Sequence, residues 1–548
     1  MGVLRTPMPP IPKWGARARR ATARVAPTGD SRRTRGVGAG LAPARSAVGI
    51  TGVLLMTLLA YPAATTAQQT ASAAQTRLAG GDKPRPYDST RPTPPSLETG
   101  SEPRPYDTMR LAGGGESPPA SATGGDKPGP YDSTPEAGPY TLVRAARVID
   151  GRGGEPLSPG MILIRGELIE AIGANLAIPE DTRVIDLRGA TVLPGLIDLH
   201  THLTDKVGLH WEEVLLKSTP GQAALFGAKN ARDTLLAGFT TCRDMGPTWP
   251  FTDVDLRDVI DQGALPGPRL QVAGNYVSAT GGAGDARQFS IYVDVPLVQN
   301  LADGVDAVRH AVRTNFKHGA DFIKILATGA VLSKGIPPGA QQYSDEELQV
   351  AVEEATRWGR YVAAHAHGAE GIKAAIRAGV RTIDHGSMMD DEGIEMLKAR
   401  SQQTYYVPTL YVGEVVIAEG RELGVPDSEI QRSREMSAYR TSTFRRALRA
   451  GLTIPFGTDA GVFPHGRNAR EFALRVREGE SPMHAIVSAT HDSAQAIGWL
   501  ERVGTIEPGK YADLIAVDHD PLQDITELER VRWVMKGGIV YRSRTDEP

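Results

Sequence analysis

The sequence of 548 residues has little cysteine, with Cys242 as its single example. One cysteine excludes an intrachain disulfide, and we expect Cys242 to be a small buried apolar side chain. The sequence also lacks an excess of charge, because its formal net charge is −3. This balance gives no reason to expect a nucleic-acid partner. With 40% hydrophobic residues, the chain can instead bury a large core.

Long apolar runs are scarce near the N-terminus, where residues 47–60 form the only one. The run is too short to span a bilayer comfortably but suits the apolar part of a signal peptide. An Arg-rich stretch with one acidic residue, Asp30, precedes it, and TTA at 65–67 supplies a cleavage site. We therefore predict a signal peptide over 1–67, no stable membrane anchor, and a periplasmic or secreted protein. The alternative is a cytoplasmic protein with a disordered head.

Residues 68–138 have few aliphatic side chains and many Pro, Gly, Ser and Thr residues. They contain a loose repeat, DKPRPYDST, SEPRPYDTM and DKPGPYDST. Such a segment buries too little apolar surface to offset the entropy of ordering its backbone. It is predicted to be a disordered linker.

From residue 191 to 502, short apolar segments alternate with helical patterns, which is typical of βα units and a parallel sheet. Ser344 and Glu347 form a capping-box pattern at the start of one helix. Eight such units predict an α/β fold with a closed (β/α)₈ TIM barrel. The predicted strands are 192–200, 239–244, 270–276, 322–328, 361–367, 382–386, 405–410 and 454–459.

Short β-like segments flank the predicted barrel on both sides, at 139–190 and 503–543. Examples are MILIRGELIEAIG on the N-terminal side and VRWVMKGGIVYR on the C-terminal side. We expect the two regions to pair into one small composite β-sandwich, which would bring the ends of the folded part together.

Histidines occur where several predicted strands end, which is where a barrel of this type places its catalytic groups. His200 and His202 close the first strand, and side chains two apart on a strand point the same way, about 6.6 Å apart. His365 and His367 close the fifth strand, and His385 closes the sixth. Each alone is compatible with an ordinary core histidine, but their shared position predicts a metal site.

Two further polar side chains complete this set of strand-end residues. Lys324 lies inside the apolar run DFIKIL, where an unpaired lysine is rare. It is either a salt-bridged or snorkelling lysine, or a neutral amine that would capture carbon dioxide as a carbamate bridging two cations. Asp459 ends the last predicted strand and is the candidate catalytic base, then acid. Two divalent ions would lower the pKa of a bridging water and polarise a carbonyl. Zinc suits the nitrogen and oxygen ligands, with manganese and cobalt as alternatives.

Six stretches of the sequence resemble the amidohydrolase superfamily, in the imidazolonepropionase-like subgroup that contains Xaa-Pro dipeptidases. The likeness covers roughly residues 140–543, and the combination of motifs is highly specific. The matching stretches are VLPGLIDLHTHL, FIKILATGAVLS, VAAHAHGAEGI, TIDHGSMMD, PFGTDAG and GTIEPGKYADLIAVD.

The resemblance implies a role for each residue of the predicted site. His200, His202 and Asp459 would hold the more buried metal, and carboxylated Lys324 would bridge to the second. It further implies hydrolysis of an amide bond in a dipeptide such as Xaa-Pro or in an N-acyl amino acid. Homo-oligomers occur among such relatives. The remaining implied residues are His365 and His385 on the second metal, and His367 and His465 at the substrate.

Two positions depart from the motifs of these relatives. Ala283 stands where TGGHGD has its histidine, which removes a contact to the substrate carbonyl or carboxylate and puts dipeptide specificity in question. Ala330 replaces a glycine of ATGGVLS at the rim of the expected pocket.

Three alternative functions remain open on the sequence alone. A mononuclear deaminase of the same superfamily carries a Glu three residues after its strand-5 histidine. Counting from His365 gives Gly368, whereas counting from His367 gives Glu370. An imidazolonepropionase-type cyclic amidohydrolase works with one metal and lacks the lysine found at Lys324. A non-catalytic, surface-displayed binding protein would not need the full ligand set.

Overall fold

The computed structural model describes residues 139–543, with gaps at 209–210, 286–288, 291, 294–299 and 334–335. These residues belong to one compact unit, 117–548. The predicted signal peptide (1–67) and linker (68–138) lie outside the described residues. Within the described part of the chain, no helix is long and apolar enough to cross a membrane.

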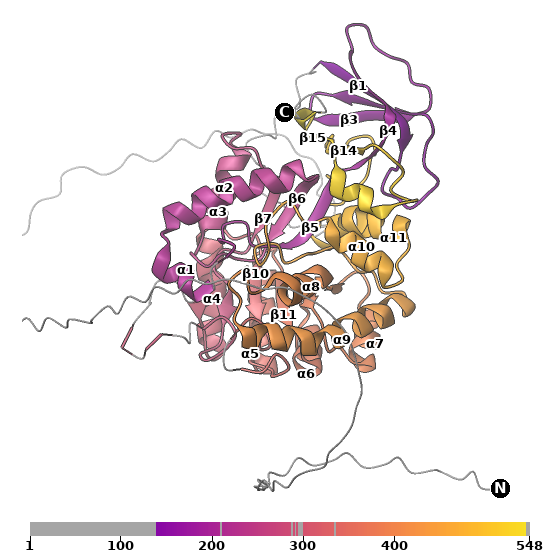
Figure 1. The fold of residues 1–548 in the computed structure, drawn as a ribbon. Helices are drawn as coiled ribbons and strands as arrows, with labels where there is room; N and C mark the ends of the chain where they lie inside the picture. The colour runs from indigo at the N-terminus through magenta and orange to yellow at the C-terminus, as the bar shows by residue number, and fades with distance from the viewer. Residues whose placement is uncertain are drawn as a thin grey trace, which may run out of the picture. The chain divides into compact units, whose positions relative to one another are not determined.

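The two regions that flank the predicted barrel form one seven-stranded sheet (Figure 1). Its central contact is the antiparallel pairing of a C-terminal strand, β14, with an N-terminal strand, β4. A second β layer, as in a sandwich, stays a prediction. In spatial order the strands are β16 (Ile539–Arg542), β15 (Trp533–Lys536), β14 (Leu514–Val517), β4 (Arg183–Pro194), β1 (Tyr140–Val148), β2 (Gly160–Arg165) and β3 (Leu168–Gly173).

The nine strands that the structure describes between these regions pair in parallel, as predicted for βα units. They fall into a three-stranded and a six-stranded sheet, so the continuous closed barrel also stays a prediction. The first sheet contains β5 (Leu196–Thr201), β6 (Phe239–Asp244) and β7 (Arg269–Val272). The second contains β13 (Tyr405–Val407), β12 (Thr382–His385), β11 (Val362–Ala366), β10 (Ile323–Leu326), β8 (Val277–Ser278) and β9 (Asn300–Leu301).

The predicted eighth strand, 454–459, is wrong as a regular strand, although its backbone lies against β5. The Leu199 amide donates to the Phe456 carbonyl (2.9 Å), and the Asp459 amide donates to the His200 carbonyl (2.8 Å). The Thr458 amide instead donates to the Asp198 carboxylate (3.1 Å), and Asp459 adopts a left-handed backbone with φ of 66°. A side chain thus replaces a backbone acceptor, and the turn at Asp459 ends the regular pairing.

Helices follow most of the parallel strands and cover their outer face (Figure 1). The capping box predicted for α5 is confirmed, because the Glu347 amide donates to Ser344 Oγ (3.3 Å) and the Ser344 amide donates to Glu347 Oε2 (2.8 Å). These helices are α1 (Trp211–Lys217), α2 (Pro220–Leu236), α3 (Thr252–Asp261), α4 (Val305–Lys317), α5 (Asp345–Arg357), α6 (Ala369–Ala378) and α7 (Asp391–Ala399).

The remaining helices follow β13 and the segment at 454–459. α8 and α9 pack against each other, and a π-helical turn interrupts the path from α11 to α12. They are α8 (Leu410–Glu419), α9 (Asp427–Arg449), α10 (Arg470–Arg477), α11 (Pro482–Val487), η1 (Ser488–Asp492), α12 (Ser493–Ala496) and the 3₁₀ turn η2 (Ile525–Arg530).

Apolar side chains of the strands and their helices form two large clusters. Ile325 and Ile383 pack with Phe444 in the first, under the six-stranded sheet. Phe239 and Phe456 belong to the second, which joins the three-stranded sheet to the C-terminal strands. Cys242 is buried in that second cluster, as predicted. Apolar packing of the strands and helices therefore fixes the positions of the polar strand-end residues.

Candidate active site

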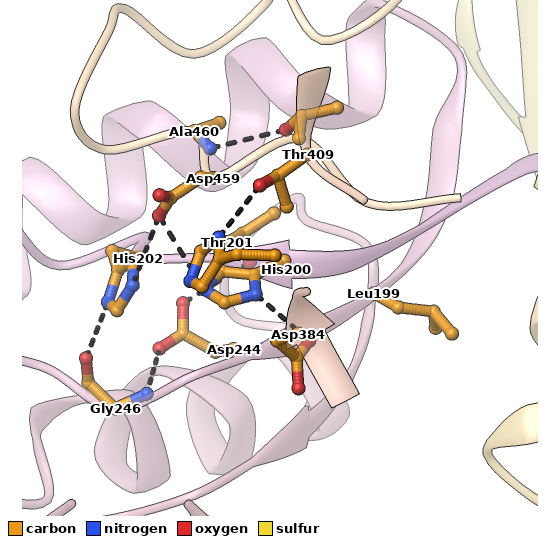
Figure 2. A network of polar contacts seen from close by, with 12 residues as sticks. Leu199, His200, Thr201, His202, Asp244, Gly246, Asp384, Thr409, Asp459 and Ala460 are labelled. Carbon is orange, nitrogen blue, oxygen red and sulfur yellow. Dashed lines mark hydrogen bonds and ion pairs between the residues drawn. The ribbon is translucent and has the colours of Figure 1, made fainter. Parts of the chain in front are cut away.

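The end of β5 directs two imidazoles at one carboxylate (Figure 2). His200 and His202 lie two apart on the strand, and their ring centroids are 5.5 Å apart. Nε2 of each ring lies 3.5 Å from Asp459 Oδ1. The end of β5 and the turn at Asp459, which are far apart in the sequence, thus supply three possible metal ligands.

Three more imidazoles extend this group at the ends of β11 and β12. The ring of His385 lies 4.7 Å from that of His200 and 4.7 Å from that of His365, between centroids. His367 lies 4.7 Å from His365 and 5.1 Å from His385. The structure therefore brings together all five histidines that the strand ends predicted.

The orientation of four of these rings is fixed by hydrogen bonds at Nδ1, which leaves Nε2 as the nitrogen for a metal. His365 differs, because its Nε2 contacts the Gly329 carbonyl (3.3 Å) and its Nδ1 is the nitrogen for a metal. The Nδ1 contacts of the other four are His200 to Asp384 Oδ1 (3.0 Å), His202 to the Gly246 carbonyl (2.7 Å), His367 to Ser387 Oγ (2.9 Å) and His385 to Thr409 Oγ1 (2.7 Å).

Burial keeps four of the imidazoles in the neutral form that binds metal. It lowers the pKa of His200, His367 and His385 well below the usual value, and that of His365 to about 3. The nearby cation Lys324 lowers the pKa of each further. Ligating atoms of His200, His385 and Asp459 all lie within 4.8 Å of one another. This donor set fits a divalent metal ion.

Lys324 lies on β10 with its side chain in the same space. It is 3% exposed, and burial lowers the pKa of its amine to about 8, against the opposing effect of Asp384 and Asp459. Near neutral pH a much larger fraction of such an amine is uncharged than in an exposed lysine. The environment is therefore suited to carbamate formation.

Burial also raises the pKa of Asp459, while His202 and Lys324 act to lower it. Its backbone is left-handed, as are those of His385 (φ 69°) and Thr409 (φ 47°). Non-glycine residues adopt this conformation at an energetic cost and gather at functional sites. Two of these strained positions are members of the imidazole and carboxylate cluster, and the third, Thr409, contacts His385.

Next to the site lies a buried ion pair that the sequence patterns do not predict. The Arg243 guanidinium donates to Asp384 Oδ1 (2.9 Å) and to the Leu199 carbonyl (2.8 Å), and both side chains are fully buried. Asp384 also accepts from Thr382 Oγ1 (2.8 Å). Through the contact of Asp384 with Nδ1, the ion pair fixes the orientation of the His200 ring. The sequence signal for this ion pair is a charged residue within each of two strands, Arg243 in FTTCRD and Asp384 in TIDH.

Asp198 holds the two backbones of the site together. Its carboxylate accepts from Thr458 Oγ1 (2.6 Å), Asn468 Nδ2 (2.7 Å) and the His200 amide (3.0 Å). Burial raises its pKa to about 6. It therefore ties β5 to the segment that carries Asp459.

The cluster opens into a cavity of about 250 Å³. His367 lines it, as do Ala283 and Ala330, the two positions that depart from the family motifs. His465 is not among the lining residues. Its ring is buried, with Nε2 3.3 Å from the His202 carbonyl and Nδ1 3.2 Å from Thr234 Oγ1. The structure thus places His465 against the backbone of His202, and its contact with a substrate stays a prediction.

Comparison with known proteins gives the same kind of fold. An Xaa-Pro dipeptidase structure with bound methionine has 37% identity and a TM-score of 0.69, over 74% of this chain and 100% of the other. A prolidase complexed with N-methylphosphonate-L-proline has 29% identity and a TM-score of 0.70, over the same shares. Ochratoxinase of Aspergillus niger is 32% identical over 427 residues, 73% of this chain and 86% of its own length. The amidohydrolase family model matches residues 191–540, so the chain belongs to the amidohydrolase family.

Proposed function

We propose that the protein is a metal-dependent hydrolase that cleaves an amide bond, in a dipeptide such as Xaa-Pro or in an N-acyl amino acid. One observation carries the proposal: five imidazoles, a buried amine and a carboxylate surround one cavity. The names of the similar proteins, an Xaa-Pro dipeptidase, a prolidase and an ochratoxinase, support the choice of substrate class.

The donor atoms suit two divalent ions, with zinc as the first choice. His200, His202 and Asp459 would hold one ion, and His365 and His385 the other. Lys324, as its carbamate, would bridge them. Bound metal would lower the pKa of a water and polarise the amide carbonyl.

The chain's own contribution to the reaction is proton transfer and orientation. Asp459 Oδ1 lies beside the Nε2 atoms of His200 and His202, so it is placed to accept a proton from the attacking water. Its raised pKa suits a group that later returns this proton to the leaving amine. His367 lines the cavity and faces the substrate. His465 holds the backbone of His202.

Two rival functions make different demands on Lys324. A mononuclear deaminase or an imidazolonepropionase-type enzyme needs no second metal and no bridging amine. The buried lysine beside the imidazoles therefore supports the two-metal hydrolase. A non-catalytic binding protein would have no need of strained left-handed backbone at His385, Thr409 and Asp459.

The fold and location that accompany this function are also proposals. The parallel strands and the family match support a closed (β/α)₈ barrel over 191–502. The Arg-rich head and the apolar run at 47–60 support export to the periplasm or the medium.

The Asp459→Asn variant tests the assignment of the proton shuttle. The full-length, metal-loaded protein is first screened against dipeptides and N-acyl amino acids. We expect the variant to lose at least about 100-fold in kcat on the best substrate, because general acid and base catalysis contributes about that much. Bound metal, measured by elemental analysis, should remain largely intact because the histidines persist. Loss of metal together with turnover would count against the shuttle role.

A further inference from the structure

A buried cation lines the far side of the active-site cavity. Arg440 lies on α9, which packs beside α8 (Figure 1), and its side chain is 6% exposed. Arg440 lines the same cavity as His367 and Asp459, and its charge acts on the pKa of both. It is therefore close enough to the reacting groups to touch a substrate bound there.

Among the described residues, no hydrogen bond or ion pair joins the Arg440 guanidinium to another side chain or backbone atom. The carboxylates that act on its charge are engaged elsewhere. Glu471 accepts from the backbone amides of Leu410 (3.0 Å) and Tyr411 (2.7 Å), and Asp459 lies against the two histidines of β5. Buried arginines are almost always paired, so a guanidinium without an anion indicates that an anion arrives with a ligand.

Gly413 of α8 makes room for this guanidinium. A Cβ atom at Gly413 would lie 1.8 Å from Arg440 Nη1 and 2.4 Å from Cζ. Any side chain at position 413 would therefore push the guanidinium away from its place. The close packing fixes the planar group, and such a fixed group binds a carboxylate through two parallel hydrogen bonds with little loss of entropy.

Apolar side chains of α8 and of the loop after it line the same cavity, Val412, Val416 and Val425 among them, and Glu429 and Ser433 of α9 are the buried polar residues beside them. A cation in a cavity with these apolar side chains suits a ligand with an apolar body and one anionic group. We infer that Arg440 is the specificity residue for a free carboxylate on the substrate, so that the preferred substrates are amides of amino acids rather than neutral amides. This inference rests on the proposed function and names the residue that would recognise the carboxylate of its substrates.

Binding tests the inference without turnover. The probes are 3-phenylpropanoate and the neutral 3-phenylpropan-1-ol, which contain no amide bond to cleave, titrated by calorimetry into the full-length protein. Wild type should bind the carboxylate about 100-fold more tightly, as expected for charge-assisted hydrogen bonds in a buried site. Arg440→Met should abolish this preference, and Arg440→Lys should keep part of it. Equal binding of the two probes by wild type would overturn the inference, whatever the enzyme hydrolyses.

Two further variants separate the inference from a loss of folding. Gly413→Ala leaves the arginine in the sequence but displaces it, so the preference should fall as in Arg440→Met. Lys206 is an exposed cation on the same cavity, and Lys206→Met should keep the preference. A preference that survives in Gly413→Ala and in Arg440→Met, or that disappears in Lys206→Met, would assign the carboxylate to another group.

Kinetics links the inference to the proposed function. For each substrate found, kcat/KM is compared with that of its carboxamide analogue. The Arg440→Met variant should lose about 100-fold on the carboxylate and little on the carboxamide. Equal losses on both would contradict a role in carboxylate recognition. Absence of any amide hydrolysis by wild type would instead refute the proposed function and leave the binding result to decide the role of Arg440.

Discussion

Lys324 differs from the other side chains of the site because its proposed role requires a covalent change, from amine to carbamate. We expect Lys324→Ala to lower the metal content from two ions per chain towards one, since the bridging ligand is lost. Elemental analysis of protein prepared with bicarbonate and excess zinc measures this. Lys206→Met, which removes a lysine at the same cavity, should keep both ions. Two ions retained in Lys324→Ala would refute the bridging role.

The residues of the site differ in how far the sequence could predict them. Apolar runs precede or surround four residues of the site, so the sequence predicts their place in a strand or at its end. The structure places these four around one cavity: His200, His202, Lys324 and Asp459. Arg440 left no such signal. It lies in a polar, Arg-rich helix, and its burial depends on Gly413 in a different helix. Contacts between distant elements carry no local pattern.

At the scale of one helix, the capping box of α5 gives a stability prediction. Replacing Ser344 with alanine removes the acceptor for the Glu347 amide and should lower the free energy of unfolding by about 1 kcal/mol. Chemical denaturation measures the change. Ser401→Ala, at an exposed turn serine, should have almost no effect. An equal loss in the two variants would show that capping is not the cause.

Some features of the helices and strands are determined by residues close together in the sequence, and others by contacts between distant residues. A capping box joins residues three apart, so sequence alone predicted it correctly. The segment at 454–459 has the apolar composition of a strand, yet its conformation depends on Asp198, far away in the chain. Its left-handed turn at Asp459 is imposed by these distant contacts, and no local pattern could reveal it.

For the whole molecule, buried carboxyl groups predict how stability changes with pH. Burial raises the pKa of Glu471 to about 8 and also raises those of Asp244 and Asp253. In the unfolded chain these groups release their protons near pH 4, whereas the buried histidines with lowered pKa values have the opposite effect only below about pH 7. Between about pH 7 and pH 8 the folded state therefore holds more protons. The free energy of unfolding should therefore fall as the pH rises through this range.

Glu471→Gln tests this dependence. The variant removes one of the groups that stay protonated, so its stability should fall less steeply with pH than that of wild type. Urea denaturation at several pH values between about 7 and 8 measures the slope. Glu422→Gln, at an exposed glutamate, should leave the slope unchanged. A slope in Glu471→Gln as steep as in wild type would refute the assignment.

Only Gly195 separates β4 from β5, so the strand with His200 continues directly from one whose neighbour, β14, lies near the C-terminal end of the described chain. His200 and His202 are therefore synthesised long before β14, the strand that pairs with β4. We expect metal to bind only after this contact has formed, because β4 and β5 are almost continuous and β14 supports β4. Nascent chains arrested before residue 514 should emerge without stoichiometric metal, and loading belongs to the completed polypeptide.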